Sequence, residues 1–292
     1  MAHSTHERKT GRNGEFGWSM TRDYRRLIVL PALFLVIFFL WPIARVVIRS
    51  DADPAGDLSN YAHIFTSRLY LQVIANTIQS AAVVTLVSLL IAYPVAYAIT
   101  SARGRGVQIL LTVVVISLWT SAVIRSYAWM VLFQRKGVVN DALIALAILR
   151  DPISFVPGTF VVNVGMVHIM LPIMILPLVA NMRSIDRSLL RAASVLGASD
   201  FMAFWKIFLP LSLPGVSAGV ALVFLMSLGF FVTPALLRGP RHMMMAVLIE
   251  QQANSLLNWG LASALATLLL LLTAGLYAAY ARFNSRMSSA GI

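Results

Sequence analysis

Residues 188–219, which read SLLRAASVLGASDFMAFWKIFLPLSLPGVSAG, decide the fold. This stretch is more polar than the long apolar runs on either side, so we expect it to lie outside a membrane. Its pattern nevertheless predicts two short helices. Gly197 is suited to the turn that ends the first helix. Ser199 is suited to the N-cap of the second, with Asp200 in its first turn.

The second helix is predicted to carry one aromatic face. Its aromatic residues recur at i, i+3, i+4 and i+7, the spacing of one side of a helix: Phe201, Phe204, Trp205 and Phe208. We expect Pro210 and Pro214 to end this helix before the next apolar run begins. An aromatic face needs something to cover it. Spacing alone leaves open whether this is the membrane surface, a neighbouring loop or another protein.

Composition places the whole chain in a membrane. Of its 292 residues, 59% are hydrophobic and 12% are charged, whereas a soluble domain carries about 25% charged residues. The net charge of +12 could suggest a nucleic-acid partner. The basic residues, however, gather at the ends of apolar runs, which is the pattern of membrane topology. The chain has no cysteine, so disulfides and thiolate chemistry are excluded.

Six apolar segments reach the roughly 20 residues that a spanning helix needs. They are approximately residues 27–48, 72–100, 107–133, 157–180, 213–236 and 258–281. We therefore expect an all-α integral membrane protein with one domain at 27–283 and short tails at 1–26 and 284–292. The first tail is basic and lacks a signal-peptide cleavage site, so we expect it to be retained.

The distribution of Lys and Arg predicts the orientation. With a cytoplasmic N-terminus, the inner segments carry 14 basic residues and the outer segments carry 7. This excess favours cytoplasmic termini and a cytoplasmic position for residues 188–219. The outer loop at 49–71 is acidic, with Asp51, Asp53 and Asp57. The apolar run at 142–149 is too short to span, and we expect an interfacial or re-entrant helix there.

The stretch 188–219 resembles the EAA signature of the inner-membrane permease subunits of binding-protein-dependent ABC importers. The match includes Ala192-Ala193, Leu196-Gly197-Ala198 and Leu209-Pro210, but Arg191 stands where the family has Glu. The resemblance implies a type I ABC importer permease (MetI-like) fold in the bacterial inner membrane, with a cytoplasmic coupling helix in the loop 184–212 that docks on an ATPase subunit. The coupling residues that it implies are Arg191, Ala192, Ala193, Leu196, Gly197, Ala198, Phe201, Phe204, Trp205 and Pro210.

Two further strings are similar to the polyamine and opine branch of that family. They are Arg125-Ser126-Tyr127-Ala128-Trp129 and Ser227-Leu228-Gly229-Phe230-Phe231-Val232-Thr233-Pro234, in which Phe230 replaces an acid that many members carry. We take as candidates for the solute path Arg125, Tyr127, Trp129, Gly229, Phe230, Thr233 and Glu250.

The residues themselves leave their roles open. Arg125 is either a functional buried charge or an interfacial Arg that reaches toward water. Gly229 either permits a close approach or break beside the pore, or serves ordinary helix packing. Glu250 either contacts a cationic solute or is a solvated loop carboxylate.

An enzyme is not indicated. His168 stands alone on the fourth segment, where hydrogen bonding to a neighbouring helix is the usual role, and no metal-ligand spacing is present. No GxxxxGK[ST] loop occurs, so we expect no cofactor and assign ATP hydrolysis to another subunit.

The resemblance therefore implies a permease subunit that moves a small solute such as spermidine, putrescine or an opine-like compound. It also implies three kinds of partner: a second, related permease chain, two ATP-binding subunits and a periplasmic solute-binding protein. Two alternatives are an ion-coupled secondary transporter, which should carry paired acids at mid-bilayer, and a non-transporting membrane scaffold.

Overall fold

The computed structural model describes residues 28–29, 31–50, 59–102, 104–237, 239 and 243–289, with side chains as far as Arg282. The predicted tail 1–26 and the acidic residues Asp51, Asp53 and Asp57 lie outside the described residues, as do the side chains of the predicted tail 284–292. The regular elements within the described ranges are all helices. The chain divides after Val46 into two units, and each is described by itself.

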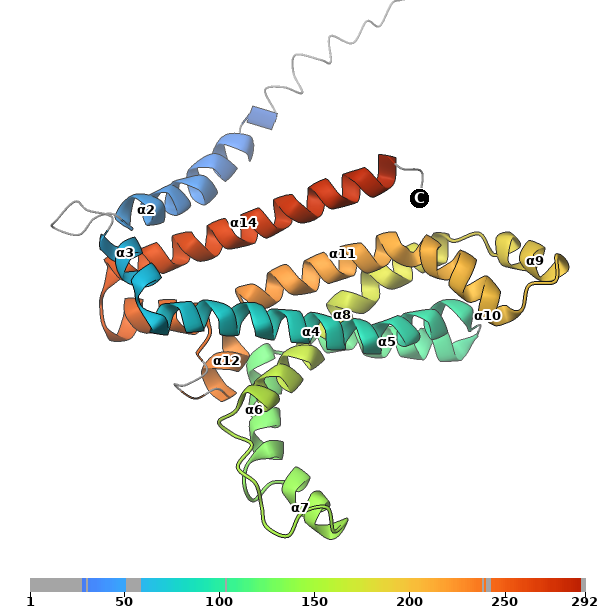
Figure 1. The fold of residues 1–292 in the computed structure, drawn as a ribbon, viewed down its shortest axis with the longest axis horizontal. Coiled ribbons are helices and arrows are strands. Elements are labelled where there is room, and N and C mark those ends of the chain that lie inside the picture. The colour runs from blue at the N-terminus through green and yellow to red at the C-terminus, as the bar shows by residue number, and fades with distance from the viewer. Residues whose placement is uncertain are drawn as a thin grey trace, which may run out of the picture. The chain divides into compact units, whose positions relative to one another are not determined.

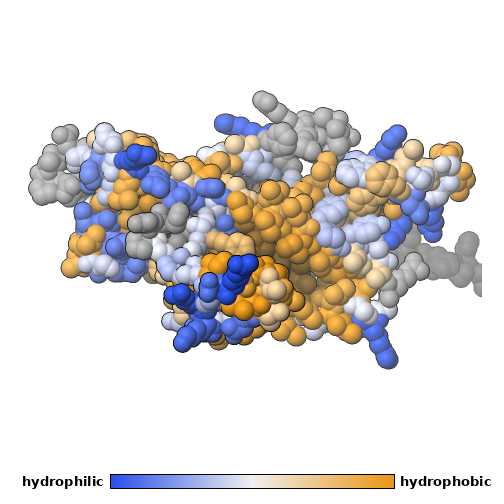
Figure 2. All heavy atoms as spheres, turned by 60° about the horizontal axis from the view of Figure 1, so that its bottom comes forward, coloured by the Kyte–Doolittle hydropathy of each residue, from blue (hydrophilic) through white to orange (hydrophobic). Residues whose placement is uncertain are grey.

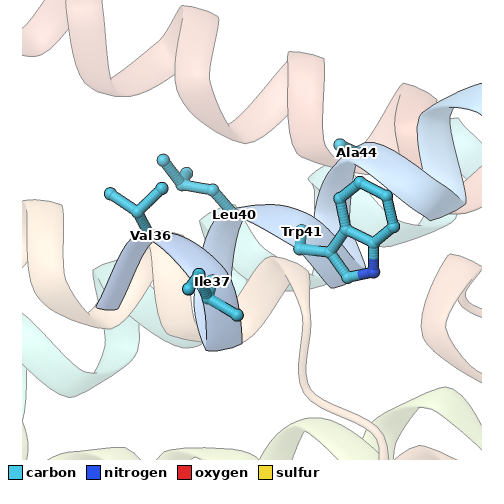
Figure 3. Close-up of a pocket in the computed structure, with 5 residues that line it drawn as sticks. All are labelled: Val36, Ile37, Leu40, Trp41 and Ala44. Atoms are coloured by element: carbon cyan, nitrogen blue, oxygen red, sulfur yellow. The ribbon is translucent and has the colours of Figure 1, made fainter. Parts of the chain in front are cut away.

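The N-terminal unit is an apolar helix. It contains the π-helix η1 (Val36–Leu40) and continues into α2 (Trp41–Arg49). The candidate span Pro31–Arg49 has a mean hydropathy of 2.3, and none of its most apolar window is buried within the structure. Figure 3 shows the residues that line an open groove of about 410 Å³ on this helix, namely Val36, Ile37, Leu40, Trp41 and Ala44. Its apolar part, before Arg45, is suited to lipid or to another membrane helix.

The second unit is built on three long helices that lie side by side (Figure 1): α4 (Arg68–Ser101), α8 (Thr159–Ser184) and α11 (Leu209–Leu228). The central one is α8, because 61% of its most apolar window is buried. Its fully buried side chains recur every four residues, which places them on one helix face: Met166, Met170, Met174, Leu178 and Met182. The predicted segments 72–100 and 157–180 are therefore single helices.

Two glycines let α11 approach α8 closely. A Cβ atom on Gly215 would lie 2.6 Å from Cβ of Asn181, and one on Gly219 would lie 2.7 Å from Sδ of Met174. The four-residue spacing is the pattern by which small residues bring two membrane helices together. Sequence reasoning missed this contact, although the spacing Gly215-x-x-x-Gly219 was visible.

A second cluster joins both ends of the unit's sequence. The helices α3 (Ser59–Thr66), α13 (Met245–Glu250) and α14 (Trp259–Ser289) bury apolar side chains against the start of α4. The hydroxyl of Thr77 accepts a hydrogen bond from the Met245 N–H at 2.9 Å. The π-helix η4 (Gln251–Ser255) connects α13 to α14. The last predicted segment, 258–281, is thus confirmed as one helix.

The third predicted segment, 107–133, is not one straight helix. Its chain forms α5 (Arg105–Trp119) and α6 (Ala122–Phe133), which are separated at Thr120–Ser121. The direction changes by 98° there, so the described residues contain five straight candidate spans, or six if this bent pair crosses as one. Apolarity predicted membrane insertion, but a bend carries no hydropathy signal.

The short helix predicted at 142–149 lies slightly earlier in the chain. Helix α7 (Val138–Ala145) follows α6 on an arm that projects from the three-helix core in Figure 1. Buried Asn140 holds this arm together, because its side-chain amide donates to the carbonyls of Gln134 and Ile153 and accepts from the Ile153 N–H. Over the face shown in Figure 2, hydrophobic residues form a band between more hydrophilic ends, as a membrane protein requires.

Candidate functional site

The hairpin predicted around Gly197 is present. Helix α9 (Arg187–Val195) ends at Leu196, and Gly197 follows with φ +85°, a backbone conformation that glycine adopts without steric cost. Ser199 then caps α10 (Asp200–Ala203) by accepting a hydrogen bond from the Met202 N–H at 3.3 Å. The predicted turn at Gly197 and the predicted N-cap at Ser199 are therefore confirmed.

Asp186 caps the first helix of this hairpin. Its carboxylate accepts hydrogen bonds from the Ser188 N–H at 2.8 Å and from the Ser188 hydroxyl at 2.6 Å. These bonds hold the pKa of Asp186 below its ordinary value, and the nearby charge of Arg191 lowers it further. At the same end, Arg187 donates to the carbonyl of Thr100 in the last turn of α4, so α9 is attached to the core by a cation at a helix C-terminus.

The prediction that Pro210 and Pro214 end the second helix is wrong. The chain passes from α10 through the π-helix η2 (Phe204–Phe208) into α11, giving one helical stretch Asp200–Leu228. Pro210 comes two residues after η2, where the Leu209 N–H donates to the Phe204 carbonyl and the regular α-helical bonding is already interrupted. The Ser217 hydroxyl donates to the Pro214 carbonyl at 2.9 Å. Pro214 itself frees the carbonyl of Pro210, four residues earlier, and proline in membrane helices is tolerated where neighbouring helices, side chains or water satisfy such groups.

The predicted single aromatic face is divided in two. Phe208 is 2% exposed and packs edge-on against Tyr97, with ring centroids 5.0 Å apart. Phe204 also meets Tyr97, at 5.5 Å. In contrast, Phe201 is 74% exposed and Trp205 is 53% exposed. The division follows from η2, where the Leu209 N–H donates to the Phe204 carbonyl five residues back, so the residues do not keep α-helical spacing.

The exposed residues of the hairpin form an apolar surface beside a small hollow. We call the set Val195, Leu196, Phe201, Met202 and Trp205 the hairpin surface. The hollow measures about 250 Å³ and includes Arg191, Asp200 and Tyr97 in its lining. Of the other predicted coupling residues, Ala192 is exposed, Ala193 is buried, and Ala198 and Pro210 are half-buried. An exposed apolar surface of this kind is typical of a docking site.

A second constellation lies where α6 meets α8 and α12 (Val232–Leu237). Ser126 and Thr233 are fully buried, and their hydroxyl oxygens are 2.8 Å apart. Gly165 of α8 provides the room, because a Cβ atom there would lie 2.9 Å from Cγ2 of Thr233. The Trp129 indole N–H donates to Nδ1 of His168 at 3.2 Å. The expected role of His168, a hydrogen bond to a neighbouring helix, is confirmed.

Arg125 is the charged residue of this constellation. It is 9% exposed, and Nη2 of its guanidinium donates to the Thr120 carbonyl at 2.9 Å. Its Nε and Nη1 atoms are buried and have no hydrogen-bond partner among the described residues. Charged side chains within apolar segments are costly unless they are paired, and they mark functional positions. The side chain is buried within the chain, so its charge is placed among the packed helices.

The remaining candidates are divided between two places. Gly229 follows the end of α11, and a Cβ atom there would meet nothing within 4 Å, so the residue marks a helix break and not a close approach. Phe230 is half-buried beside that break, and Tyr127 is 49% exposed. Glu250 ends α13, where its carboxylate accepts a 3.4 Å hydrogen bond from Asn254. The contacts described for Glu250 do not include Arg125.

Some polar residues were missed by sequence reasoning. Ser126 lies in α6, just after the break between α5 and α6. Ser227 lies at the end of α11, just before the break at Gly229. Both side chains are fully buried. A hydroxyl within an apolar run is a weak signal, since many such groups bond to their own helix, as Ser126 also does to Ala122. Among the described residues, no group of three His, Asp or Glu side chains is placed to hold a metal ion.

Long apolar helices in a bundle, an exposed apolar hairpin at one end and broken helices near the other define the class as a multi-pass membrane transport component. Residues 65–289 match the family described as binding-protein-dependent transport system inner membrane component. The chain belongs to this family. It is the permease subunit of an ABC importer, and the alternatives of an ion-coupled transporter and a scaffold are set aside.

Several permease proteins are similar to the chain. The spermidine/putrescine transport system permease protein PotB of Haemophilus influenzae is 35% identical over 263 residues, covering 87% of this chain and 92% of the relative. PotB of Escherichia coli is 30% identical over 241 residues, covering 80% and 87%. The putative 2-aminoethylphosphonate transport system permease protein PhnU of Salmonella choleraesuis is 24% identical, covering 89% and 92%.

The fold has a solved counterpart. A chain of a bacterial alginate ABC transporter, solved in complex with an alginate-bound periplasmic protein, superposes with a TM-score of 0.79 over 91% of this chain and 96% of its own. Its sequence identity of 18% supports the fold alone. Membership of the family implies that the permease works with a further permease, an ATPase and a binding protein.

Proposed function

We propose that this permease imports a small amine-bearing solute, of the polyamine, opine or amino-acid-like kind, that a periplasmic binding protein delivers. In this proposal both termini are cytoplasmic, and the hairpin surface docks on one of two ATP-binding subunits there. The twofold excess of basic residues in the inner segments supports this orientation. The names of the PotB and PhnU relatives support an amine-bearing solute.

The observation that carries the docking role is the exposure of the hairpin surface. Val195 and Leu196 are 86% and 87% exposed and directly precede the Gly197 turn, and the helices on both sides of this turn are capped by residues of the hairpin itself. The hairpin therefore needs no partner to form. Its apolar side chains, in contrast, are covered by nothing within the second unit, and a preformed apolar surface binds with little ordering cost.

The bond from Arg187 to Thr100 supports a mechanism for coupling. When two ATP-binding subunits close, a docked hairpin moves with them. Because α9 is held to the end of α4, and η2 is continuous with α11, that motion is passed to two of the three core helices. Rigid-body motion of packed helices of this kind is a common way to change access to a site.

Co-purification of the full-length permease with its ATP-binding subunit tests the proposal. We expect Trp205→Ala and Phe201→Ala each to weaken binding by about tenfold or more, since aromatic anchors at an interface contribute most of its affinity. The matched control is Ile148→Ala on the projecting arm, which removes an equally exposed apolar side chain at 64% exposure. Binding that is lowered equally by all three changes, or by none, contradicts the docking role.

Arg191 refines the same proposal. It lines the hollow beside the hairpin surface, where the similar permeases present Glu. We expect the ATP-binding subunit of this importer to present a carboxylate there, so Arg191→Glu should weaken binding while Arg191→Lys should keep most of it. Equal binding by wild type and Arg191→Glu would show that this position does not choose the partner.

A further inference from the structure

The second unit contains two helix breaks whose following helices, α6 and α12, pack against each other. The first separates α5 from α6 at Thr120–Ser121, and the second separates α11 from α12 at Gly229–Phe231. The hydrogen bond between Ser126 and Thr233 joins the segments that follow the two breaks. Broken helices within a membrane protein are tolerated where they are buried in protein or line a cavity, and solute sites in transporters are often built from them.

Both breaks carry buried polar atoms that lack a partner among the described residues. Arg125, in the first turn of α6, leaves Nε and Nη1 without an acceptor, and Ser227, in the last turn of α11, leaves its hydroxyl unbonded. The one hydrogen bond of the guanidinium goes to the Thr120 carbonyl, which the first break has freed. Arg125 thus stabilises the break and still presents two donor nitrogens.

No carboxylate is available to neutralise this cation from the spanning helices. The sequences of α4, α5, α6, α8, α11 and α12 contain no Asp or Glu. Phe230 stands at the second break, three residues before Thr233, at the position where similar permeases carry an acid. A permease with that acid would carry a positive group on α6 and a negative group at the break before α12, two helices that pack against each other. This chain has the positive group, Arg125, but has Phe230 in place of the acid.

We propose that Arg125 recognises an anionic group, a carboxylate or a phosphonate, on the solute that crosses beside α6. A guanidinium binds such groups through parallel N–H···O hydrogen bonds, and it does so most strongly where water is excluded. The solute is then zwitterionic: its amine is the feature shared with the substrates named for the relatives, and its anionic end meets Arg125. This inference rests on the proposed function, because it assumes that the chain conducts an amine-bearing solute.

The test uses the complete transporter, purified with its partner permease and ATP-binding subunits and without the binding protein. Binding of radiolabelled 4-aminobutyrate and 2-aminoethylphosphonate is compared with that of putrescine, a diamine that differs from 4-aminobutyrate in one terminal group. We expect saturable binding of at least one anionic probe and weaker binding of putrescine. Arg125→Gln should lower the affinity for the anionic probe at least tenfold, whereas Arg125→Lys should lower it less.

The control is Arg135→Gln, which removes an exposed guanidinium from the turn after α6 and should leave probe binding unchanged. Phe230→Asp places an acid at the second break and should weaken binding of the anionic probe while strengthening binding of putrescine. Size-exclusion chromatography shows whether each variant still assembles, so a misfolded variant is recognised.

Three results overturn the inference. They are the absence of anionic-probe binding in the wild type, equal binding by Arg125→Gln, and loss of the permease pair in Arg125→Gln, which would assign the guanidinium to a carboxylate of the second permease. In each case, intact assembly with ATP-binding subunits leaves the proposed function standing. Failure of the wild-type chain to assemble with them overturns the proposed function itself.

Discussion

The helix Asp200–Leu228 contains Pro210 and Pro214 and continues through both, whereas the chain from Arg105 to Ala145 contains no proline and turns by 98°. In the first segment, a π-turn and close contact with α8 hold the backbone helical. In the second, Arg125 bonds to the carbonyl freed at the bend, and Ser126 bonds to Thr233. The contacts that a segment makes with other helices therefore determine where a membrane helix breaks more than its own proline content does.

The packing of η2 gives the largest expected effect. Phe208 is 2% exposed against Tyr97, and Trp205, three residues away, is 53% exposed. We expect Phe208→Ala to lower the free energy of unfolding by about 3–5 kcal/mol, because it removes a contact that holds the proline-containing helix to α4. Trp205→Ala should change it by less than about 0.5 kcal/mol. Thermal unfolding of the detergent-solubilised protein measures both, and similar losses would contradict the division of the aromatic face.

The glycine contacts between α11 and α8 give the next effect. A methyl group at position 215 would lie 2.6 Å from Cβ of Asn181, so Gly215→Ala should cost about 1–3 kcal/mol through overpacking. The matched control is Gly275→Ala on α14, where a Cβ atom meets nothing within 4 Å. The same unfolding measurement should show the control to be neutral or slightly stabilised. A neutral Gly215→Ala would show that packing on α8 does not keep this helix straight.

The bend between α5 and α6 is tested by a smaller change. Thr233→Val keeps the shape of the side chain and removes the hydroxyl that faces Ser126, so we expect a loss of about 1 kcal/mol in the free energy of unfolding. A double-mutant cycle with Ser126→Ala isolates the pair, and coupling of roughly 0.6 kcal/mol is typical of hydrogen bonds between membrane helices. Zero coupling would show that the bond between Ser126 and Thr233 does not stabilise the bend, and that the bond from Arg125 to the Thr120 carbonyl does so by itself.

The smallest effect is a pH dependence at the start of α9. Because the pKa of Asp186 is lowered in the folded state, its stabilising contribution is present above the ordinary Asp value of about 3.9 and is lost as the pH falls through the lower folded pKa. We expect faster hydrogen exchange at the amides of Ser188 and Leu189 in acid, after correction for intrinsic rates. Asp186→Asn, which does not titrate, should remove this pH dependence and keep the cap.

These contrasts explain what the sequence could predict. Long apolar runs identified the spanning segments, and Gly197 and Ser199 identified the hairpin, because each signal is local. The bend at Thr120 and the continuity past Pro210 depend on residues far away in the chain, such as Thr233 and Asn181. In the candidate site, too, local features could be predicted and contacts between distant residues could not. Arg125 was recognisable as a charge in an apolar run, but its unpaired nitrogens and the pairing of Ser126 with Thr233 appear only in the fold.

The π-helix η2 also sets the rotational phase of the hairpin. An α-helix advances 100° per residue, so one extra residue in a π-turn rotates everything on its N-terminal side by about that angle relative to α11. Deleting one residue from Phe204–Phe208 would restore an unbroken α-helical ladder while turning Phe201 and the hairpin surface about a quarter of a revolution. Such a permease would keep its membrane-spanning segments, yet the residues that we propose dock on the ATP-binding subunit would face a different direction.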